Sequence, residues 1–157
     1  MLVLAGTAVA AVLWCAGRER PAIAIARRMC DGLDAAHAVH VLHGHVRPAN
    51  VVISRSGAVK VGDFGFAPVP AIDERDDVHG VGTVLFELLA GHVPPDLDPI
   101  LRRARADDRA RRHDSCAELE RDLARVAHAL GLELTDRQIG TWIVREIAGW
   151  SPTLRGW

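Results

Sequence analysis

The chain has 157 residues, of which 49% are hydrophobic, so it is long and apolar enough to form one globular domain with a core. Its formal net charge is -1, from 19 basic and 20 acidic residues, which argues against a nucleic-acid or membrane-surface binder that works through bulk charge. The cysteines, Cys15, Cys30 and Cys116, are odd in number and widely spaced. This pattern argues against a disulfide framework and predicts buried thiols in a reducing compartment, the cytoplasm.

The first seventeen residues carry no charge and are followed by Arg18-Glu19-Arg20. A signal peptide would need a basic stretch before the apolar one, and this run has none. The run also lies at the short limit for a membrane span. We therefore expect residues 1–17 to form a buried helix of a soluble domain, with a membrane anchor as the alternative.

The first half of the chain predicts a long helix followed by short strands. Apolar residues recur at helical spacing over 21–38. Val41-Leu42 is predicted to be a short strand. Val51–Ile53 and Ala58–Val61 are predicted to pair as a hairpin, because they flank the turn Arg55-Ser56-Gly57.

The second half is predicted to be helical. Residues 76–90 place apolar side chains on one face and end at Gly91, and 97–106 form a shorter helix. Two capping boxes open the last helices, residues 115–118 for a helix to about 130 and residues 135–138 for one to about 148. The apolar face of the last helix consists of Ile139, Trp142, Ile143 and Ile147.

The most informative stretch runs from Ala36 to Ala67 and reads AHAVHVLHGHVRPANVVISRSGAVKVGDFGFA. It resembles the catalytic core of serine/threonine protein kinases, especially bacterial ones. These have a helix ending in Ala-His, a strand, a loop of the form HRDxKPxN, a hairpin and a DFG triplet. Here the loop is residues 43–50 and the triplet is Asp63-Phe64-Gly65. Residues 73–91 resemble the buried F helix of kinases, 108–119 the region before the last kinase helix, and 6–17 the segment after the hinge. The resemblance therefore covers about residues 1–130.

This resemblance implies an α+β, mainly helical fold, the C-terminal lobe of a kinase with a small β-hairpin insert and without the N-terminal lobe. Residues 1–130 would form the truncated lobe, and 131–157 a C-terminal helix and tail packed on it. In the family, an Asp at the position of Asp77 supports the catalytic loop from below. Arg112 takes the position of a structural Arg, and its usual Glu partner in an APE motif is missing from this sequence.

The resemblance also indicates that the catalytic set is not intact. Phosphoryl transfer needs held phosphates, metal ions and an oriented nucleophile. The loop Asp that accepts the hydroxyl proton is replaced by His45, the Arg before it by Gly44, and the loop Lys by Arg47. The two metal-ligand positions are kept as Asn50 and Asp63.

Other parts of the family pattern are missing as well. The only lysine is Lys60, so the strand Lys that grips the nucleotide has no counterpart, and no Gly-rich loop precedes this region. Only residues 68–72 stand where the family has a long activation loop. We therefore expect an inactive, pseudokinase-like protein that requires no cofactor and keeps only a vestigial Mg-ATP site at Asn50 and Asp63. It would bind a protein, not a nucleic acid, through the bare upper face of its lobe.

Several alternatives stay open. A kinase whose N-terminal lobe lies upstream or in another chain would transfer phosphate from ATP to proteins. A membrane anchor at residues 1–17 would give a membrane-bound kinase-like protein. A decaying coding sequence is a further alternative, against which the capping boxes and the helix periodicity argue. Closely spaced histidines could bind Zn, Ni or Cu, although no Cys or carboxylate lies nearby in sequence to complete a site: His37, His40, His43 and His45.

Overall fold

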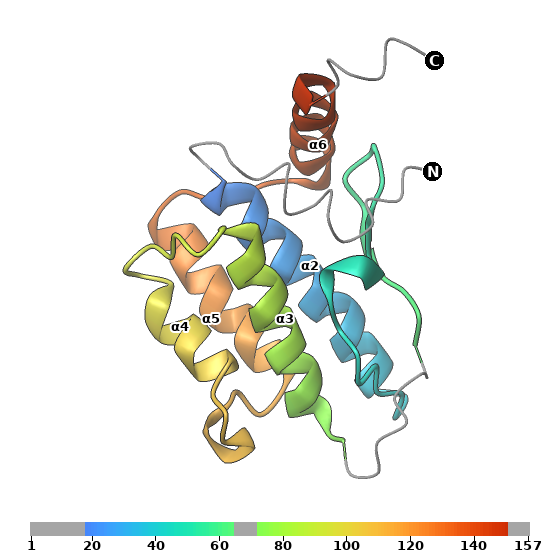
Figure 1. The fold of residues 1–157 in the computed structure, drawn as a ribbon, viewed down its shortest axis with the longest axis vertical. Coiled ribbons are helices and arrows are strands. Elements are labelled where there is room, and N and C mark those ends of the chain that lie inside the picture. The colour runs from blue at the N-terminus through green and yellow to red at the C-terminus, as the bar shows by residue number, and fades with distance from the viewer. Residues whose placement is uncertain (1–17, 65–71, 151–157) are drawn as a thin grey trace.

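The computed structural model describes residues 18–64 and 72–150, with the side chains of 18–64 and 72–145. Several predictions fall outside these residues: the helix or anchor at 1–17 with Cys15, the Gly of the DFG triplet, the short segment at 68–72 up to Ala71, the side chain of Ile147, and the tail at 151–157. The described part is mainly helical and carries one small sheet (Figure 1). The predicted α+β, mainly helical architecture is therefore confirmed.

The helices surround one long helix. In chain order they are α2 (Glu19–His37), α3 (Glu74–Leu88), α4 (Asp98–Ala104), α5 (Cys116–Ala129) and α6 (Asp136–Trp150), with short 3-10 turns at Pro48–Asn50 and Arg109–Arg111. Strands β1 (Val51–Ile53) and β2 (Val59–Val61) form the predicted antiparallel hairpin, in which Val51 lies opposite Val61. Figure 1 shows the hairpin extending toward α6.

Helix α2 is the centre of the molecule. It packs against α3 and α5 and also contacts β2 and α6. Six consecutive residues, 21–26, are buried, so the first half of the helix is covered on all sides rather than along one stripe. Its C-terminal half buries only the stripe that includes Met29 and Leu33.

Two thiols meet between α2 and α5. Cys30 and Cys116 are both free and fully buried. A hydrogen bond with Cys116, followed by burial, raises the pKa of the Cys30 thiol well above its ordinary value. The prediction of buried thiols without a disulfide is confirmed for these two residues.

Side-chain caps define where the later helices begin. At α6 the predicted box is complete, because Gln138 accepts from the Thr135 N–H at 2.8 Å and Thr135 accepts from the Gln138 N–H at 3.4 Å. At α5 the Ser115 hydroxyl accepts from the Glu118 N–H at 3.2 Å, but the Glu118 carboxylate binds the N–H of Asp114, one residue before Ser115. The helices therefore begin where the sequence predicted, with one rearranged cap.

Two sequence predictions need correction. Val41-Leu42 has no regular secondary structure and pairs with no described strand, so it is not a strand. Helix α3 covers 74–88 rather than 76–90. It begins earlier because Asp73 caps it, and it ends earlier because Ala90 and Gly91 both have positive φ, 48° and 74°.

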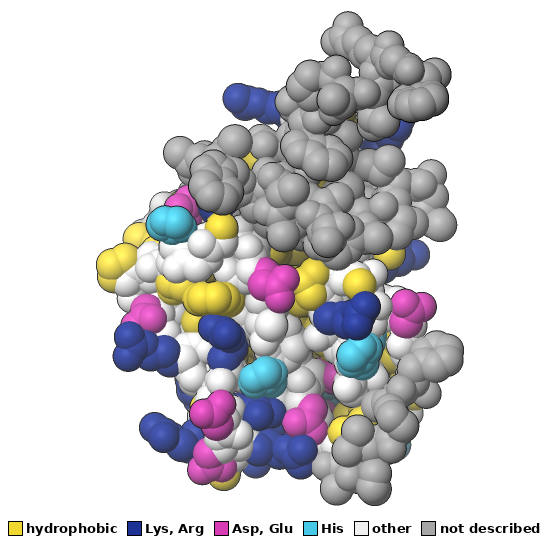
Figure 2. Space-filling model, viewed as in Figure 1, with side chains coloured by type: hydrophobic (Ala, Val, Ile, Leu, Met, Phe, Trp, Pro, Cys, Tyr) yellow, Lys and Arg dark blue, Asp and Glu magenta, His cyan; other side chains and the backbone are white. Residues whose placement is uncertain are grey.

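The surface of the described part mixes charges of both signs. Figure 2 shows acidic and basic side chains interspersed over the lower half of the face in view. Many of them are paired, such as Arg75 with Asp114 at 2.6 Å and Arg103 with Glu118 at 2.8 Å. Within the described residues, no helix is both long and apolar enough to cross a lipid bilayer.

Candidate functional site

The loop at residues 43–50 is supported from below by Asp77 of α3. The Asp77 carboxylate is completely buried, and its oxygens accept hydrogen bonds from the N–H of His43 at 2.9 Å and from that of Gly44 at 2.7 Å. A buried carboxylate is stable only when donors surround it, and here the loop backbone provides them. The supporting role that the resemblance gave to Asp77 is therefore present in the geometry.

His37, at the end of α2, is a third partner of Asp77. Its Nε2 donates to the same carboxylate at 2.8 Å, while its Nδ1 lies 3.7 Å from Glu74. Sequence reasoning noted His37 as the end of a helix and as one of four closely spaced histidines, but not as a partner of Asp77. The described residues contain no cluster of His, Cys, Asp or Glu arranged to hold a metal ion, and His37 and His43 have protein partners instead.

His43 ties the loop to the residue after the hairpin. Its Nε2 donates to the Gly62 carbonyl oxygen at 2.7 Å, and its Nδ1 accepts from the N–H of His45 at 3.2 Å. One tautomer, with the proton on Nε2, satisfies both contacts. The His43 ring also packs on Phe64, with ring centroids 4.6 Å apart. His43 is thus a buried structural residue, as the resemblance implied.

His45 stands where the resemblance places the carboxylate base. Its side chain is exposed, and the Arg47 guanidinium donates to its Nε2 at 3.3 Å. A general base needs a free lone pair directed at the substrate proton. In this arrangement the Nε2 lone pair of His45 is occupied by a cation.

Asn50 and Asp63 flank the open end of the hairpin. The pairing of Val51 with Val61 places Asn50 beside Gly62, whose N–H donates to the Asn50 carbonyl oxygen at 2.8 Å. The Asn50 amide donates to the carbonyl oxygen of His45 at 3.0 Å, so it orders the loop.

The donor atoms at this end of the hairpin fit a magnesium ion in part. Because the Asn50 side chain uses its NH₂ group on His45, its amide oxygen is left for a ligand. The Asp63 carboxylate is exposed and has no hydrogen-bond or ion-pair partner among the described residues. Mg²⁺ prefers oxygen ligands and is usually held by one or two side chains, with waters and phosphates completing its shell. Asn50 and Asp63 would supply those two side chains.

Two residues near the site lie in the left-handed region, one in the loop and one after the hairpin. Gly44 has φ of 68° and Asp63 has φ of 63°. Glycine adopts this conformation without steric cost, whereas a residue with a Cβ does so under strain. The glycine at position 44 therefore lets the loop turn without steric strain at the residue whose N–H donates to Asp77.

Arg112 has a partner that sequence reasoning missed. Its guanidinium donates to the Asp76 carboxylate at 3.1 Å and to the Ala106 carbonyl oxygen at 2.8 Å. Arg109 joins the same carboxylate at 2.9 Å. Asp76 also closes the cap of α3, since it accepts from the N–H of Asp73 at 3.1 Å. The spacing of Asp73 and Asp76 was the signal in the sequence that could have indicated this cap.

Comparison with known proteins places this geometry among kinases. No family model matches the chain. The serine/threonine-protein kinase PknB of Mycolicibacterium smegmatis is 28% identical over 164 residues, which cover 68% of this chain and 26% of that protein. PknL of Mycobacterium tuberculosis is 33% identical over 98 residues, covering 46% of this chain and 25% of that kinase.

A solved structure agrees with the sequence comparison. The crystal structure of the Mycobacterium tuberculosis PknI kinase domain matches with a TM-score of 0.57 and 29% identity, over 66% of this chain and 53% of that domain. The chain is related to bacterial serine/threonine protein kinases. It spans about a quarter of the length of the curated kinases and about half of the PknI domain. The alignment with PknB is 164 residues long but covers only 68% of this chain. PknB therefore has residues within the matched region that are absent from this chain.

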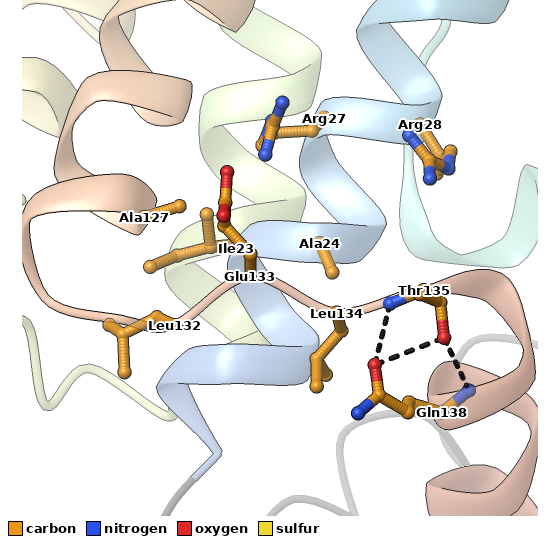
Figure 3. Close-up of a pocket in the computed structure, with 10 residues that line it drawn as sticks. All are labelled: Ile23, Ala24, Arg27, Arg28, Ala127, Leu132, Glu133, Leu134, Thr135 and Gln138. Carbon is orange, nitrogen blue, oxygen red and sulfur yellow. Dashed lines mark hydrogen bonds between the residues drawn. The ribbon is translucent and has the colours of Figure 1, made fainter.

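A separate cavity lies away from the loop at residues 43–50, the kinase-like loop. It encloses about 250 Å³ between α2, the end of α5 and the start of α6 (Figure 3). Arg27 binds Glu120 at 2.8 Å, and Arg28 binds Asp136 at 2.8 Å, so both cations at the cavity already have carboxylate partners. The cavity is lined by Ile23, Ala24, Arg27, Arg28, Ala127, Leu132, Glu133, Leu134, Thr135 and Gln138. None of the sequence-predicted site residues contributes to it.

Proposed function

We propose that this kinase relative does not transfer phosphate and acts by binding another protein. The observation that carries the proposal is His45, which stands at the base position with its Nε2 lone pair engaged by Arg47. A base held in this way cannot accept a hydroxyl proton without first losing its partner. The Arg47 contact also places a cation where the family has the loop Lys, so the two substituted residues bind each other.

Retention of the supporting network favours a folded module over a decaying sequence. The buried Asp77 carboxylate still accepts three hydrogen bonds at 2.7 to 2.9 Å, from the His37 ring and from the N–H groups of His43 and Gly44. A buried carboxylate that lost its donors would cost about 3–5 kcal/mol, so the network is retained only in a chain that folds. The loop is thus kept as structure while its reacting residues differ.

The proposed partner is a protein that covers the upper face of the lobe, either a second copy or a separate chain. Support comes from the resemblance, because a kinase C-terminal lobe packs this face against another folded unit, the rest of the domain. Sedimentation velocity over a wide concentration range tests the second copy. A purely monomeric chain would exclude self-association and leave a separate chain as the proposed partner.

The test of inactivity is transfer of labelled phosphate from ATP, with Mg²⁺ or Mn²⁺, to the chain itself and to a general protein substrate. We expect no transfer by the natural chain, assayed beside an active bacterial kinase. The Asp63→Asn variant is the matched control, because it removes the exposed carboxylate without changing size. Transfer by the natural chain that Asp63→Asn abolishes would refute the proposal.

A second candidate function is binding of a Mg-nucleotide without transfer. It is favoured by the Asn50 amide oxygen and the unpartnered Asp63 carboxylate at the open end of the hairpin. A ligand that binds only the native state stabilises it by about 2.7 kcal/mol at a hundredfold excess over Kd. Thermal unfolding with Mg-ATP therefore separates the two candidates: a rise in midpoint that Asp63→Asn removes supports nucleotide binding, and an unchanged midpoint excludes it.

A further inference from the structure

The start of α6 lies against the turn of the hairpin so closely that only glycine fits on either side. A Cβ added to Gly57 would lie 1.6 Å from the carbonyl oxygen of Asp136. A Cβ added to Gly140 would lie 2.3 Å from the carbonyl oxygen of Arg55. Gly57 also has φ of 89°, which a residue with a side chain rarely adopts. The backbones of the turn and of α6 are therefore in direct contact.

The described side chains of α6 also contact the core on one face. Ile139 and Ile143 are buried and Trp142 packs against the core, whereas Thr141, Val144 and Arg145 are exposed. One ion pair between Arg28 and Asp136 joins the helix to α2 (Figure 3 shows Arg28 and the Thr135–Gln138 cap at this end). A helix that packs on one face and exposes the other opens locally at a lower free energy than a helix that is buried on all sides, such as the first half of α2.

The hairpin in turn depends on its neighbours. Each strand has only three residues, and an isolated two-stranded hairpin of this size is at best marginally stable in water. Its turn is closed by the Ser54 hydroxyl, which accepts from the Ala58 N–H at 3.0 Å, and is covered on the outside by α6. The opposite end of the same ladder carries Asn50 and Asp63.

We propose that α6 is a latch whose seating on the hairpin turn keeps the whole hairpin ordered. When α6 is released, the turn loses its backbone contact, and the three-residue strands keep their pairing and the contact of β2 with α2. Order would then decrease from the turn along β1 and β2 toward the end that carries Asn50 and Asp63. When α6 is seated, both ends of the hairpin are fixed. The latch couples the C-terminal helix to the kinase-like loop through the hairpin, and this coupling does not require that a nucleotide binds.

Hydrogen exchange followed by mass spectrometry on the full chain tests the latch with Gly140→Ala. In an isolated helix, Ala is more stable than Gly by about 1 kcal/mol, so a loss of protection in α6 would come from the contact and not from helix propensity. We expect exchange to rise about tenfold, together, in residues 51–62 and 136–145, with residues 116–129 of α5 unchanged. The control is Gly32→Ala on α2, where an added Cβ meets nothing within 4 Å.

Faster exchange in α6 alone, with the hairpin as protected as in the natural chain, would overturn the proposal, and so would unchanged exchange in both. If Gly140→Ala accelerates exchange throughout the molecule, Arg28→Gln becomes the deciding variant. It removes the ion pair with Asp136 and leaves the sequences of α6 and of the hairpin intact. The latch requires that Arg28→Gln accelerate exchange in both segments by the same factor, and a rise in only one of them would refute it.

Discussion

Asp77 concentrates three hydrogen bonds on one buried carboxylate. It accepts from the N–H groups of His43 and Gly44 and from the ring of His37. Replacing it by Ala leaves these donors buried without an acceptor, and we expect Asp77→Ala to lower the free energy of unfolding by about 3–5 kcal/mol. Urea unfolding followed by circular dichroism measures the change.

Asp34 provides the comparison for that experiment. It is also an aspartate on a helix, but it is exposed, and its carboxylate has no hydrogen-bond partner among the described residues. Asp34→Ala should change the free energy of unfolding by less than about 0.5 kcal/mol. Equal effects of the two substitutions would show that Asp77 does not support the loop.

The lowered pKa of the buried His113 side chain predicts how the stability of the protein depends on pH. It is completely buried, and burial, followed by the nearby charge of Arg103, lowers the pKa of its imidazole. The unfolded chain, with an ordinary His pKa near ~6.5, therefore binds more protons than the native chain as pH falls below that value. The stability contributed by the unprotonated His113 is present above pH ~6.5 and is lost as the pH falls toward its lower folded pKa.

The measurement is the urea midpoint at a series of pH values between neutral and mildly acidic. We expect the midpoint of the natural chain to fall with decreasing pH, and His113→Gln to flatten this dependence. His128→Gln is the comparison variant, because it makes the same substitution at an exposed histidine. A slope that is the same in all three proteins would contradict the assignment to His113.

At the level of single residues, the resemblance located much of the site but not its partners. The support by Asp77 and the burial of His43 followed from motif positions, which fix backbone geometry. The hydrogen bond from His37 and the pairing of Arg112 with Asp76 did not, because they join residues far apart in sequence. The contact between His45 and Arg47 is local, yet it depends on rotamers that a motif does not specify.

Helix α3 packs against the kinase-like loop at a glycine. A Cβ on Gly80 would lie 2.5 Å from the Cβ of Val46 and 2.8 Å from its carbonyl oxygen. Although Ala has the higher helix propensity, the loop backbone would have to move, and we expect Gly80→Ala to destabilise the protein by about 1–3 kcal/mol. Gly32→Ala, at an open position in α2, should stabilise it by up to about 1 kcal/mol.

The two substitutions have the same chemistry, so thermal midpoints measured side by side isolate the effect of packing. We expect the midpoint to fall for Gly80→Ala and to rise for Gly32→Ala. If Gly80→Ala were as stabilising as Gly32→Ala, the loop would not be seated on α3 as closely as the distances to Val46 indicate.

Elements were predictable where the signal was local. The hairpin at 51–61 and the cap of α6 followed from turn residues and from the spacing of Thr135 and Gln138. Val41-Leu42 was wrongly predicted as a strand, because two β-branched or aliphatic residues say nothing about whether a partner strand exists. The seating of α6 on the hairpin turn was equally hidden, since it joins Gly57 to Gly140 and no local pattern predicts such a contact.

At the scale of the whole molecule, one core surrounds α2. Leu123 of α5 is completely buried in it, whereas Leu130, just after the same helix, is 43% exposed. We expect Leu123→Ala to cost about 2–5 kcal/mol, because it leaves a cavity, and Leu130→Ala to cost less than about 0.5 kcal/mol. Denaturant unfolding measures both changes in the free energy of unfolding. A small effect of Leu123→Ala would mean that α5 is not part of the common core.

The paired thiols of Cys30 and Cys116 give the molecule an internal reporter. Both sulfur atoms are sealed between α2 and α5, and the raised pKa of Cys30 keeps it in the unreactive thiol form. An alkylating reagent reaches them only when the two helices separate. In a Cys15→Ser chain, the alkylation rate of these sites would thus time the separation of α2 from α5 in plain buffer, with no denaturant and no attached dye.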